Sequence, residues 1–396
     1  MKKNIIFVID SLVCAGAEKS LITLLSLLDY SKYNVDLQLF AYGRPLEVFI
    51  PKEVNLLKPF PYTEFCNKSI KESLKKSVKD MDFSMMISRI KYSVALRKDK
   101  GGNAKKARLF WTNNSSVIES NTKKYDIAIS YAQGVPTFYV ADKINATKKF
   151  AWVNVSYRLD YKEKSFQEKY YKKYNKIVTV SDSARDIFLE TFSELKENIE
   201  VIYDINDCSL IRKLAESGES YTDDFDGIKI LTIGRLANQK GYDLALEACK
   251  KLKERNLKFR WYVLGVGPLK EEIEKYILEN DLQEHFKLLG ISANPYPFIK
   301  DCDLYVQTSK FEGFGLAIAE ARILNKFVVT TEFDAVYNQM IHRKNGLVVK
   351  MNSNDIANGI IEILSDEKLR KDIKCHLEKE KKGNSEEIEK FYKLII

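Results

Sequence analysis

The chain has 396 residues, of which 45% are hydrophobic and 30% are charged, a composition typical of a soluble globular protein with two domains or more. No apolar run approaches the roughly 18 residues that are needed to span a bilayer. The six cysteines show no C-x-x-C spacing, which indicates reduced thiols and excludes a disulfide framework or a zinc site, while the formal net charge of +9 favours anionic partners.

Apolar runs typical of buried strands alternate with helical patterns through the first half of the chain. The first run, Ile5–Asp10, is too short for a signal peptide, and no small-residue cleavage site follows it, so we expect a strand and a cytoplasmic protein. Helical patterns are expected at Ala17–Leu28 and Ser183–Phe192. Further strands are expected at Val35–Phe40, Asp126–Ser130, Phe150–Val155, Ile177–Val180 and Ile199–Ile202.

The whole excess of positive charge lies in one segment of the first half. Between Lys68 and Arg108 there are 13 Lys and Arg against 4 Asp and Glu, a balance of +9, and the rest of the chain is neutral. Met, Phe and Ile side chains are interleaved with these cations. Such a segment favours an anionic membrane surface or a polyphosphate ligand, and the alternative is a pair of helices with an ordinary solvated face. Because no recognition motif accompanies the charge, we expect no nucleic-acid partner.

A second strip in the first half, Tyr157 to Lys176, repeats this mixture of cations and aromatic side chains. Basic side chains are attracted to an anionic leaflet, and aromatic side chains enter the membrane interface. We therefore expect the protein to bind peripherally to the inner face of the cell membrane.

A second series of strands begins after a polar stretch, Asp204–Gly227. Strands that alternate with helices indicate parallel sheets covered on both faces, so the chain reads as two doubly wound α/β domains. We place them at residues 1–204 and 205–383, with a helix at about 384–396 that can pack back on the first domain. The strands of the second series are expected at Ile230–Ile233, Phe259–Leu264, Phe286–Leu289, Leu304–Gln307, Phe327–Thr330 and Leu347–Val349.

Two cations follow the first strand of this second series. The loop reads Gly234-Arg235-Leu236-Ala237-Asn238-Gln239-Lys240-Gly241, and it precedes a helical pattern. The fork of Arg235 and the ammonium of Lys240 suit a diphosphate, whereas a solvent-facing loop is the plain alternative. The next loop, Gly265-Val266-Gly267, indicates a close-packed turn at the same edge of the sheet.

Two glutamates stand eight positions apart in the run Ser309-Lys310-Phe311-Glu312-Gly313-Phe314-Gly315-Leu316-Ala317-Ile318-Ala319-Glu320. The run joins a strand, a Gly-rich loop and the start of a helix. Exposed amides and the positive end of the helix dipole would attract a negative or hydroxyl-rich ligand. Glu312 would lie over that ligand, and Glu320 would reach a second set of hydroxyls. The alternative is a tight turn with ordinary surface glutamates.

The order and spacing of these motifs resemble the donor-binding half of the retaining glycosyltransferases of family 4. Those enzymes have the GT-B fold, in which two Rossmann-like domains face each other across a cleft. The resemblance covers about residues 230–350, and two loops of the first half, at Gly16 and at Ser181, agree more loosely. It rests on Gly234-Arg235 with Lys240-Gly241, Gly265-x-Gly267-Pro268-Leu269, Asn294-Pro295-Tyr296-Pro297, and Glu312 with Glu320.

Carried over residue by residue, the resemblance implies that Arg235 and Lys240 hold the nucleotide diphosphate and neutralise the leaving group. Glu312 would contact hydroxyls of the transferred sugar, and Glu320 would accept hydrogen bonds from the ribose diol. The other donor-binding positions that it implies are Gly16, which lets the first domain close on the donor, Gly265, and the backbone amides of Phe314, Gly315 and Leu316.

Asn154 marks a departure from that pattern, because similar enzymes often carry a His there, after a Trp-containing strand. All three His residues of this chain lie in its second half, so a first-domain His base is excluded. Asn154 either forms a hydrogen bond near the reacting carbon or is a strand-end residue without a catalytic role. In such a transfer the leaving phosphate serves as the base, and the protein's task is electrostatic.

The resemblance implies a hexosyltransferase of the bacterial capsular or surface-polysaccharide type. It would move a hexose or N-acetylhexosamine from a nucleotide sugar, a UDP-sugar rather than a GDP-sugar, to a glycan or polyprenyl-diphosphate-linked acceptor. Asp301-Cys302-Asp303 has metal-site spacing, but Asp303 opens a buried strand, so we expect neither a metal nor another cofactor. Two alternatives stay open: a glycoside hydrolase that uses Glu312 and Glu320 as its carboxylate pair, and a non-catalytic nucleotide-sugar-binding scaffold.

Overall fold

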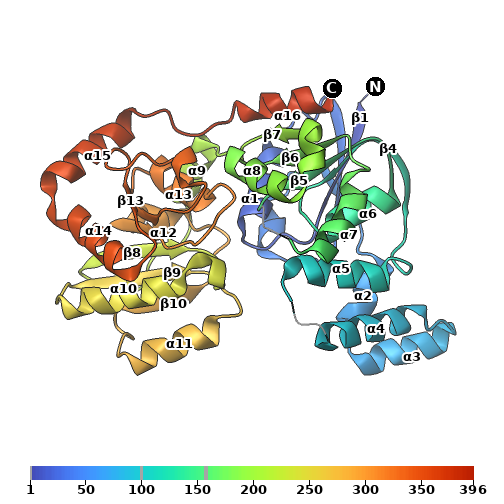
Figure 1. Ribbon diagram of the computed structural model, residues 1–396, viewed down its shortest axis with the longest axis horizontal. Helices are drawn as coiled ribbons and strands as arrows, with labels where there is room; N and C mark the ends of the chain where they lie inside the picture. Colours follow the sequence, from blue (N-terminus) through green and yellow to red (C-terminus); the bar gives the residue numbers. More distant parts are fainter. Residues whose placement is uncertain (1, 99–100, 156–158) are drawn as a thin grey trace. The chain divides into compact units, whose positions relative to one another are not determined.

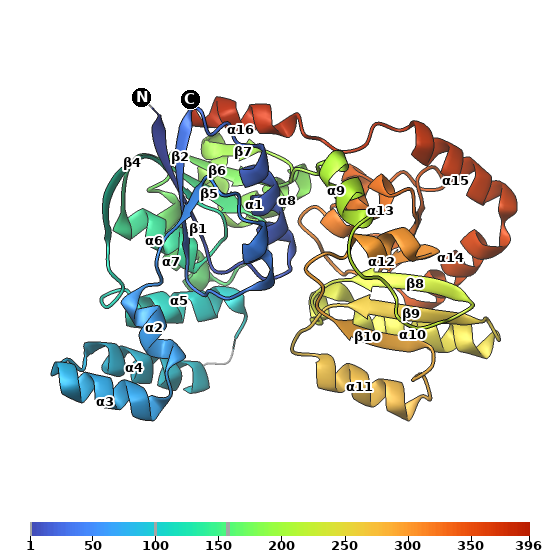
Figure 2. The same cartoon turned by 180° about the vertical axis from the view of Figure 1, so that it is seen from behind.

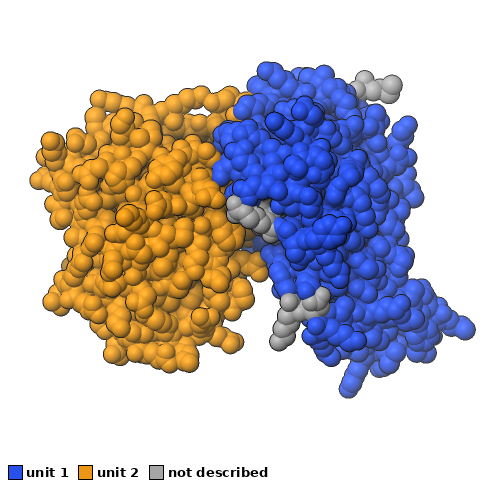
Figure 3. Space-filling model, in the orientation of Figure 1, with its two compact units in different colours: residues 1–13, 17–203, 388–396 blue, residues 14–16, 204–387 orange. Residues whose placement is uncertain are grey.

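The computed structural model describes residues 2–98, 101–155 and 159–396, which form two compact units (Figure 3). Unit 1 contains residues 1–13, 17–203 and 388–396, and unit 2 contains residues 14–16 and 204–387. Each unit has a parallel sheet flanked by helices (Figures 1 and 2), as in Rossmann-like domains. The expected fold class of two doubly wound α/β domains is confirmed.

The sheet of unit 1 has, within the described residues, seven parallel strands in the order β3-β2-β1-β4-β5-β6-β7. β1 is an interior strand, between β2 and β4, and its residues Ile5, Ile6, Phe7, Val8 and Ile9 are buried, as a strand covered on both faces requires. The strands are β1 (Lys3–Ile9), β2 (Tyr33–Leu39), β3 (Val54–Leu56), β4 (Asn121–Ser130), β5 (Ile144–Val153), β6 (Lys176–Thr179) and β7 (Ile199–Val201).

Helices of unit 1 cover this sheet, and several aromatic side chains from them form its core. Trp111, Phe138, Tyr139 and Tyr170 pack together against β1, β4 and β5. The helices are α1 (Gly16–Leu27), α2 (Pro61–Asn67), α3 (Ile70–Asp80), α4 (Ser84–Lys98), α5 (Asn103–Asn114), α6 (Val135–Lys143), α7 (Tyr161–Tyr171) and α8 (Asp182–Thr191). None of the helices in the described parts of the chain combines the length and apolarity that crossing a bilayer requires.

The last helix, α16 (Glu387–Ile395), packs on unit 1. Phe391 is fully buried, with its ring 6.2 Å from the ring of Phe7 and 6.0 Å from that of Trp152. The hydroxyl of Tyr392 accepts a hydrogen bond from the Asp29 amide at 2.9 Å. The final helix therefore completes the hydrophobic core beside β1, the first strand of the chain (Figure 1).

The sheet of unit 2 has, among the described residues, six parallel strands in the order β10-β9-β8-β11-β12-β13. Alternate residues enter opposite cores, since Trp261 and Val263 pack on one face of the sheet while Tyr262 and Leu264 pack on the other. The strands are β8 (Ile228–Ile233), β9 (Phe259–Leu264), β10 (Phe286–Gly290), β11 (Leu304–Gln307), β12 (Phe327–Thr331) and β13 (Leu347–Val349).

The helices of unit 2 divide between the two faces of its sheet. Residues of α10, α14 and α15 line one core, and residues of α12 and α13 line the other. The helices are α9 (Cys208–Ala215), α10 (Tyr242–Glu254), α11 (Lys270–Glu279), α12 (Tyr296–Asp301), α13 (Leu316–Ile323), α14 (Ser353–Ser365) and α15 (Glu367–Lys379).

The structure corrects in part the prediction that Tyr157 to Lys176 forms a second basic, aromatic surface, although Tyr161 is exposed. Its aromatic residues Tyr170, Tyr171 and Tyr174 are buried in the core of unit 1. Two of its cations have partners, since Lys173 forms an ion pair with Asp142 at 2.6 Å and Lys172 pairs with Glu168. Alternation of basic and aromatic residues here reflects a helix that packs on a sheet. Two members of the strip, Tyr157 and Arg158, lie outside the described residues.

Candidate active site

Three loops meet at the carboxyl edge of the unit 2 sheet, where β8, β9 and β11 end side by side. The backbones touch so closely that only glycine fits. A Cβ at Gly265 would lie 1.9 Å from the carbonyl oxygen of Gly234, and one at Gly241 would lie 2.0 Å from that of Thr308. Gly241 also has a φ of +64°, which disfavours other residues. The glycines therefore hold the predicted site loops against one another.

Lys240 and Glu312, which the sequence analysis placed in two different loops, form an ion pair between the Lys240 ammonium and Oε1 of Glu312. The Lys240 side chain is 19% exposed and that of Glu312 is 10% exposed. The Lys240 stem passes over Gly234, where a Cβ would lie 3.0 Å from Cδ of the lysine. The short helical turn Asn238–Lys240 thus directs the ammonium toward the loop that follows β11.

A chain of hydrogen bonds from β11 holds the same oxygen of Glu312. Ser309 Oγ donates to Oε1 at 2.6 Å, and Gln307 Nε2 donates to Ser309 Oγ at 2.7 Å. The side-chain oxygen of Gln307, Oε1, in turn accepts a hydrogen bond from the buried hydroxyl of Tyr305. Oε2 of Glu312 makes no hydrogen bond to any residue that the structure describes. Glu312 is therefore fixed through one oxygen and has the other available for a ligand.

Sequence reasoning missed Gln307 and Ser309 as residues that position Glu312. Both are buried, and both lie at or just beyond the end of β11. Polar residues at the end of a run that is otherwise apolar were the available signal, because a buried polar group needs a partner.

Gly315 sets the direction of the helix that follows. It precedes α13 with a φ of +86°, a conformation that glycine adopts without strain. Gln339 Nε2 donates to the carbonyl oxygens of Phe314 and Gly315 at 2.6 and 3.1 Å. The amides of Leu316 and the next residue lie in the first turn of α13, where no intrahelical acceptor is available. These amides can therefore bind an external acceptor.

Glu320 lies within α13 and is only 3% exposed. Its Oε1 accepts a hydrogen bond from the Tyr296 hydroxyl at 3.0 Å. Burial, with the nearby charge of Glu320, raises the pKa of Tyr296 well above its ordinary value, so this phenol stays protonated and donates. Tyr296 belongs to the quoted motif Asn294–Pro297, but the sequence did not reveal its contact with Glu320.

Arg235 contrasts with Lys240 on the same loop. Its side chain is exposed, and within the described parts of the chain it forms no ion pair or side-chain hydrogen bond. Its backbone neighbours are fixed by the bond from the Leu236 amide to Val266 O at 3.1 Å. Arg235 is therefore a free cation on a rigid loop.

The remaining predicted residues lie at strand ends or helix starts. Asn154 follows β5 in unit 1, where its Nδ2 donates to Tyr131 O at 2.8 Å and its amide donates to Gln133 Oε1 at 3.1 Å. Its Oδ1 is buried without a hydrogen-bond partner among the described residues. Gly16 is the first residue of α1 and is grouped with unit 2, where a Cβ on it would lie 3.5 Å from Leu316 Cδ1.

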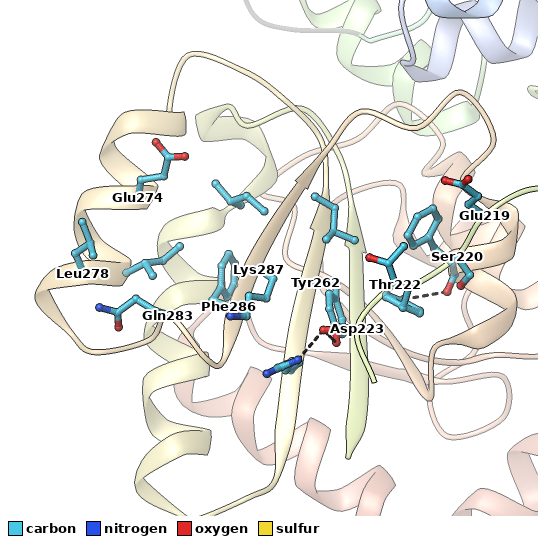
Figure 4. A pocket seen from close by; sticks show the side chains of 16 residues that line it. Glu219, Ser220, Thr222, Asp223, Tyr262, Glu274, Leu278, Gln283, Phe286 and Lys287 are labelled. Atoms are coloured by element: carbon cyan, nitrogen blue, oxygen red, sulfur yellow. Dashed lines mark hydrogen bonds and ion pairs between the residues drawn. The ribbon is translucent and has the colours of Figure 1, made fainter. Parts of the chain in front are cut away.

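A cavity of about 860 Å³ in unit 2 is separate from this set of residues (Figure 4). It lies beside the edge strand β10, and none of the predicted site residues lines it. Asp223 Oδ2 accepts from Arg260 and from the Tyr262 hydroxyl, both at 2.7 Å, at its rim. Among the described residues, no three His, Cys, Asp or Glu side chains are placed to hold a metal ion.

Residues 219–379 match the family model described as glycosyl transferases group 1. Most of unit 2 is therefore similar to a group 1 glycosyltransferase domain. All the residues of the site that belong to β8, β9, β11 and α13 lie inside the matched range. The Lys240–Glu312 pair therefore lies in the part of the chain that resembles group 1 glycosyltransferases.

Two curated relatives show how far the similarity extends. An uncharacterized glycosyltransferase of Methanocaldococcus jannaschii is 26% identical over 293 residues, which cover 64% of this chain and 72% of that protein. The N-acetylgalactosamine-N,N'-diacetylbacillosaminyl-diphospho-undecaprenol 4-alpha-N-acetylgalactosaminyltransferase of Campylobacter jejuni is 31% identical over 203 residues. That match covers 51% of this chain and 54% of the Campylobacter enzyme, so the chain spans about half the length of this relative.

Solved structures resemble the chain over nearly its whole length. The structure of Anabaena Alr3699/HepE in complex with UDP and glucose superposes with a TM-score of 0.67 at 18% identity, covering 95% of this chain and 93% of that one. A likeness at this identity shows the fold, which is GT-B. The matched residues 219–379 thus belong to one of the two Rossmann-like domains of a GT-B fold.

Proposed function

We propose that the chain is a retaining glycosyltransferase that moves a hexose or N-acetylhexosamine from a nucleotide sugar, a UDP-sugar rather than a GDP-sugar, to a growing surface glycan. One observation carries this proposal most directly. Oε1 of Glu312 is held by Lys240 and Ser309, while its Oε2 has no partner among the described residues, and Glu312 precedes the start of α13 by four positions. The Glu312 carboxylate can accept hydrogen bonds from sugar hydroxyls. The backbone amides that follow within a few residues can donate hydrogen bonds to phosphate or sugar oxygens.

In this proposal the two cations bind the diphosphate in different ways. Arg235, which has no partner among the described residues, presents a planar fork to two phosphate oxygens. Lys240 has three N–H donors, and its bond to Glu312 leaves two for phosphate. Lys240 thereby links the leaving group to the residue that orients the sugar. Glu320, held by Tyr296, is assigned to the ribose hydroxyls.

The proposed reaction conserves the anomeric configuration. The bond between the anomeric carbon and the diphosphate oxygen breaks as the acceptor oxygen bonds to the same face of that carbon, and the acceptor proton passes to the departing phosphate. The enzyme contributes by stabilising the developing diphosphate charge with Arg235 and Lys240 and by orienting the sugar with Glu312. Gly16, Gly265 and the amides at residues 314–316 would line the donor, and Asn154 would offer its buried, unpartnered Oδ1 near the acceptor.

The acceptor is proposed to be a polyprenyl-diphosphate-linked glycan at the inner face of the cell membrane. The support is the Campylobacter relative, whose name specifies a diphospho-undecaprenol-linked substrate. The glycoside hydrolase alternative is weaker, because Glu320 is buried against Tyr296 and Glu312 is paired with Lys240. A hydrolase needs both carboxylates to flank one glycosidic bond and gives no role to Arg235.

A panel of nucleotide sugars tests the donor. Binding to the native state raises the melting temperature, so UDP-sugars should stabilise the protein more than GDP-sugars or free sugars do. Addition of EDTA should not change the result. Release of free sugar from a glycan without any nucleotide would favour the hydrolase, and donor binding without transfer to a lipid-linked extract would favour the scaffold.

A further inference from the structure

The helix α3 has an unusual distribution of side chains for a protein in water. Ile70, Leu74 and Val78 follow one another at spacings of four and are 69%, 49% and 59% exposed. The side chains that α3 buries are Ser73 and Ser77. A helix of a soluble protein normally buries its apolar stripe and exposes its small polar residues.

The neighbouring helix α4 repeats this arrangement. Ile87, Ile90 and Val94, at spacings of three and four, are 49%, 54% and 41% exposed. Met81 and Phe83, in the turn between the two helices, are 87% and 45% exposed. The α3–α4 hairpin, residues 70–98, lies beyond α5 at one end of unit 1 (Figures 1 and 2). It therefore carries an apolar surface that nothing within the described residues of unit 1 covers.

Unpaired cations border the apolar stripes. The hairpin has eight Lys and Arg against three Asp and Glu. At about 100° per residue, Lys71 and Lys75 lie next to the α3 stripe and Lys91 lies next to the α4 stripe. None of these three lysines forms an ion pair or hydrogen bond with a described residue.

Four other charged groups of the region form structural hydrogen bonds or ion pairs. Glu72 bonds to Ser69 and Asp82 to the Ser84 amide, so both cap helix ends. Arg89 donates to Ser73 Oγ at 2.8 Å, and Arg108, beyond the hairpin, forms a buried pair with Glu163 at 2.7 Å. Of the basic segment from Lys68 to Arg108, these two arginines are therefore not part of a free surface. Lys71, Lys75 and Lys91 of the hairpin are part of a free surface.

We propose that the α3–α4 hairpin is a docking surface for an anionic lipid bilayer. The apolar stripes would enter the interface, and the lysines beside them would contact anionic headgroups. The combination of positive charge and exposed apolar side chains on one surface favours an anionic bilayer over other partners. A nucleic acid would leave the apolar stripes in water, and a second copy of the hairpin would bring its own positive charge to the contact.

The region around α7 differs from the hairpin. It has a similar sequence mixture, but Tyr170 and Tyr171 are buried, and Lys172 and Lys173 form ion pairs. The docking surface would bring the chain to a lipid-linked acceptor, and only this role in catalysis rests on the proposed function.

Flotation with vesicles tests the proposal directly. The wild-type protein should bind phosphatidylcholine vesicles increasingly as phosphatidylglycerol is added, and less at high salt. Lys71→Glu, Lys75→Glu and Lys79→Glu together should lower the partition coefficient at low salt by about a hundredfold, since each lysine contributes about fivefold. Leu74→Gln with Val78→Gln should lower it at every salt concentration.

Matched controls come from exposed positions outside the hairpin. Lys275→Glu, Lys368→Glu and Lys374→Glu change the net charge equally on exposed helix positions, and Leu278→Gln with Ile396→Gln removes apolar side chains that are 62% and 74% exposed. Both controls should bind vesicles like the wild type. Circular dichroism checks that every variant is folded, which the exposure of the changed positions favours.

Three results would overturn the proposal: vesicle binding that ignores lipid charge and salt, hairpin variants that bind vesicles as the wild type does, or a dimer that the hairpin variants abolish in light scattering. UDP-sugar stabilisation should be the same in all these variants. A wild-type protein that binds vesicles but no nucleotide sugar would refute the proposed function and leave the docking surface standing.

Discussion

At the residue scale, the two oxygens of Glu312 have different environments. Oε1 accepts from Lys240 and from Ser309, so the carboxylate is held before any ligand is bound. Oε2 has no such partner among the described residues. A pre-positioned acceptor loses little conformational entropy on binding, which is how a site selects one sugar orientation.

Arg235 and Lys240 should respond differently to substitution. Arg235→Ala removes an exposed side chain without partners, so nucleotide affinity should fall about 10- to 100-fold, the range of a charge-assisted bond, with no loss of stability. Lys240→Ala should weaken nucleotide binding too, but it also leaves Glu312 without its ion pair and should lower the melting temperature. Calorimetric titration with UDP and thermal melts separate the two effects. Unchanged UDP affinity in both variants would refute the phosphate assignment.

The sequence predicted Lys240 and Glu312 individually but not their contact. They are 72 positions apart, and the contact depends on β8 and β11 being neighbours in the sheet, although two strands separate them in the chain. Strand order is a property of the whole domain, which local patterns do not contain. Ser309 was visible as a polar residue at a strand end, whereas the bond from Tyr296 to Glu320 follows from tertiary packing alone.

At the scale of elements, the site depends on loops whose backbones touch. The strands of unit 2 were predictable because each is a short apolar run, and β8, β9 and β13 also lie beside a glycine. The strand β3 was missed because it has only three residues, Val54–Leu56, of which Asn55 is exposed. The α3–α4 hairpin reads as amphipathic in sequence, but only the structure shows that its apolar stripes face outward.

Gly265→Ala should disrupt the packing between the loops after β8 and β9. The added Cβ would lie 1.9 Å from Gly234 O, a backbone atom that cannot move aside alone. Overpacking of this kind typically costs about 1–3 kcal/mol, measurable as a lower free energy of unfolding in urea. Gly102→Ala is the control, because a Cβ there meets nothing within 4 Å. Equal stability of the two variants would contradict the close packing.

At the scale of the whole molecule, the chain enters unit 2 at Asp204 and returns to unit 1 at Ile388. Its last helix supplies Phe391 to the core beside Phe7 and Trp152. The first and last elements of this sequence thus stabilise one unit, and most of unit 2 is inserted between them.

Phe391→Ala should destabilise unit 1 by about 3–5 kcal/mol, the usual cost of removing a buried aromatic ring. Hydrogen–deuterium exchange should rise in peptides from β1 and β5 and stay unchanged in β8 and β9. The exposed Lys393→Ala, two positions away, is the control. Equal protection of β1 in the two variants would show that α16 does not contribute to this core.

The most direct test of the proposed function is sugar transfer by the wild type and by Glu312→Gln, with a UDP-sugar and a polyprenyl-diphosphate-linked glycan. The wild type should release UDP as it forms a product of retained anomeric configuration. Glu312→Gln should keep its UDP affinity and lose more than tenfold in kcat/KM, a loss above about 1.4 kcal/mol of transition-state stabilisation. Glu279→Gln, an exposed glutamate on α11, should transfer at the wild-type rate. A Glu312→Gln enzyme that retains more than a tenth of the wild-type kcat/KM would contradict the role given to this carboxylate, and an inverted product would contradict the proposed reaction.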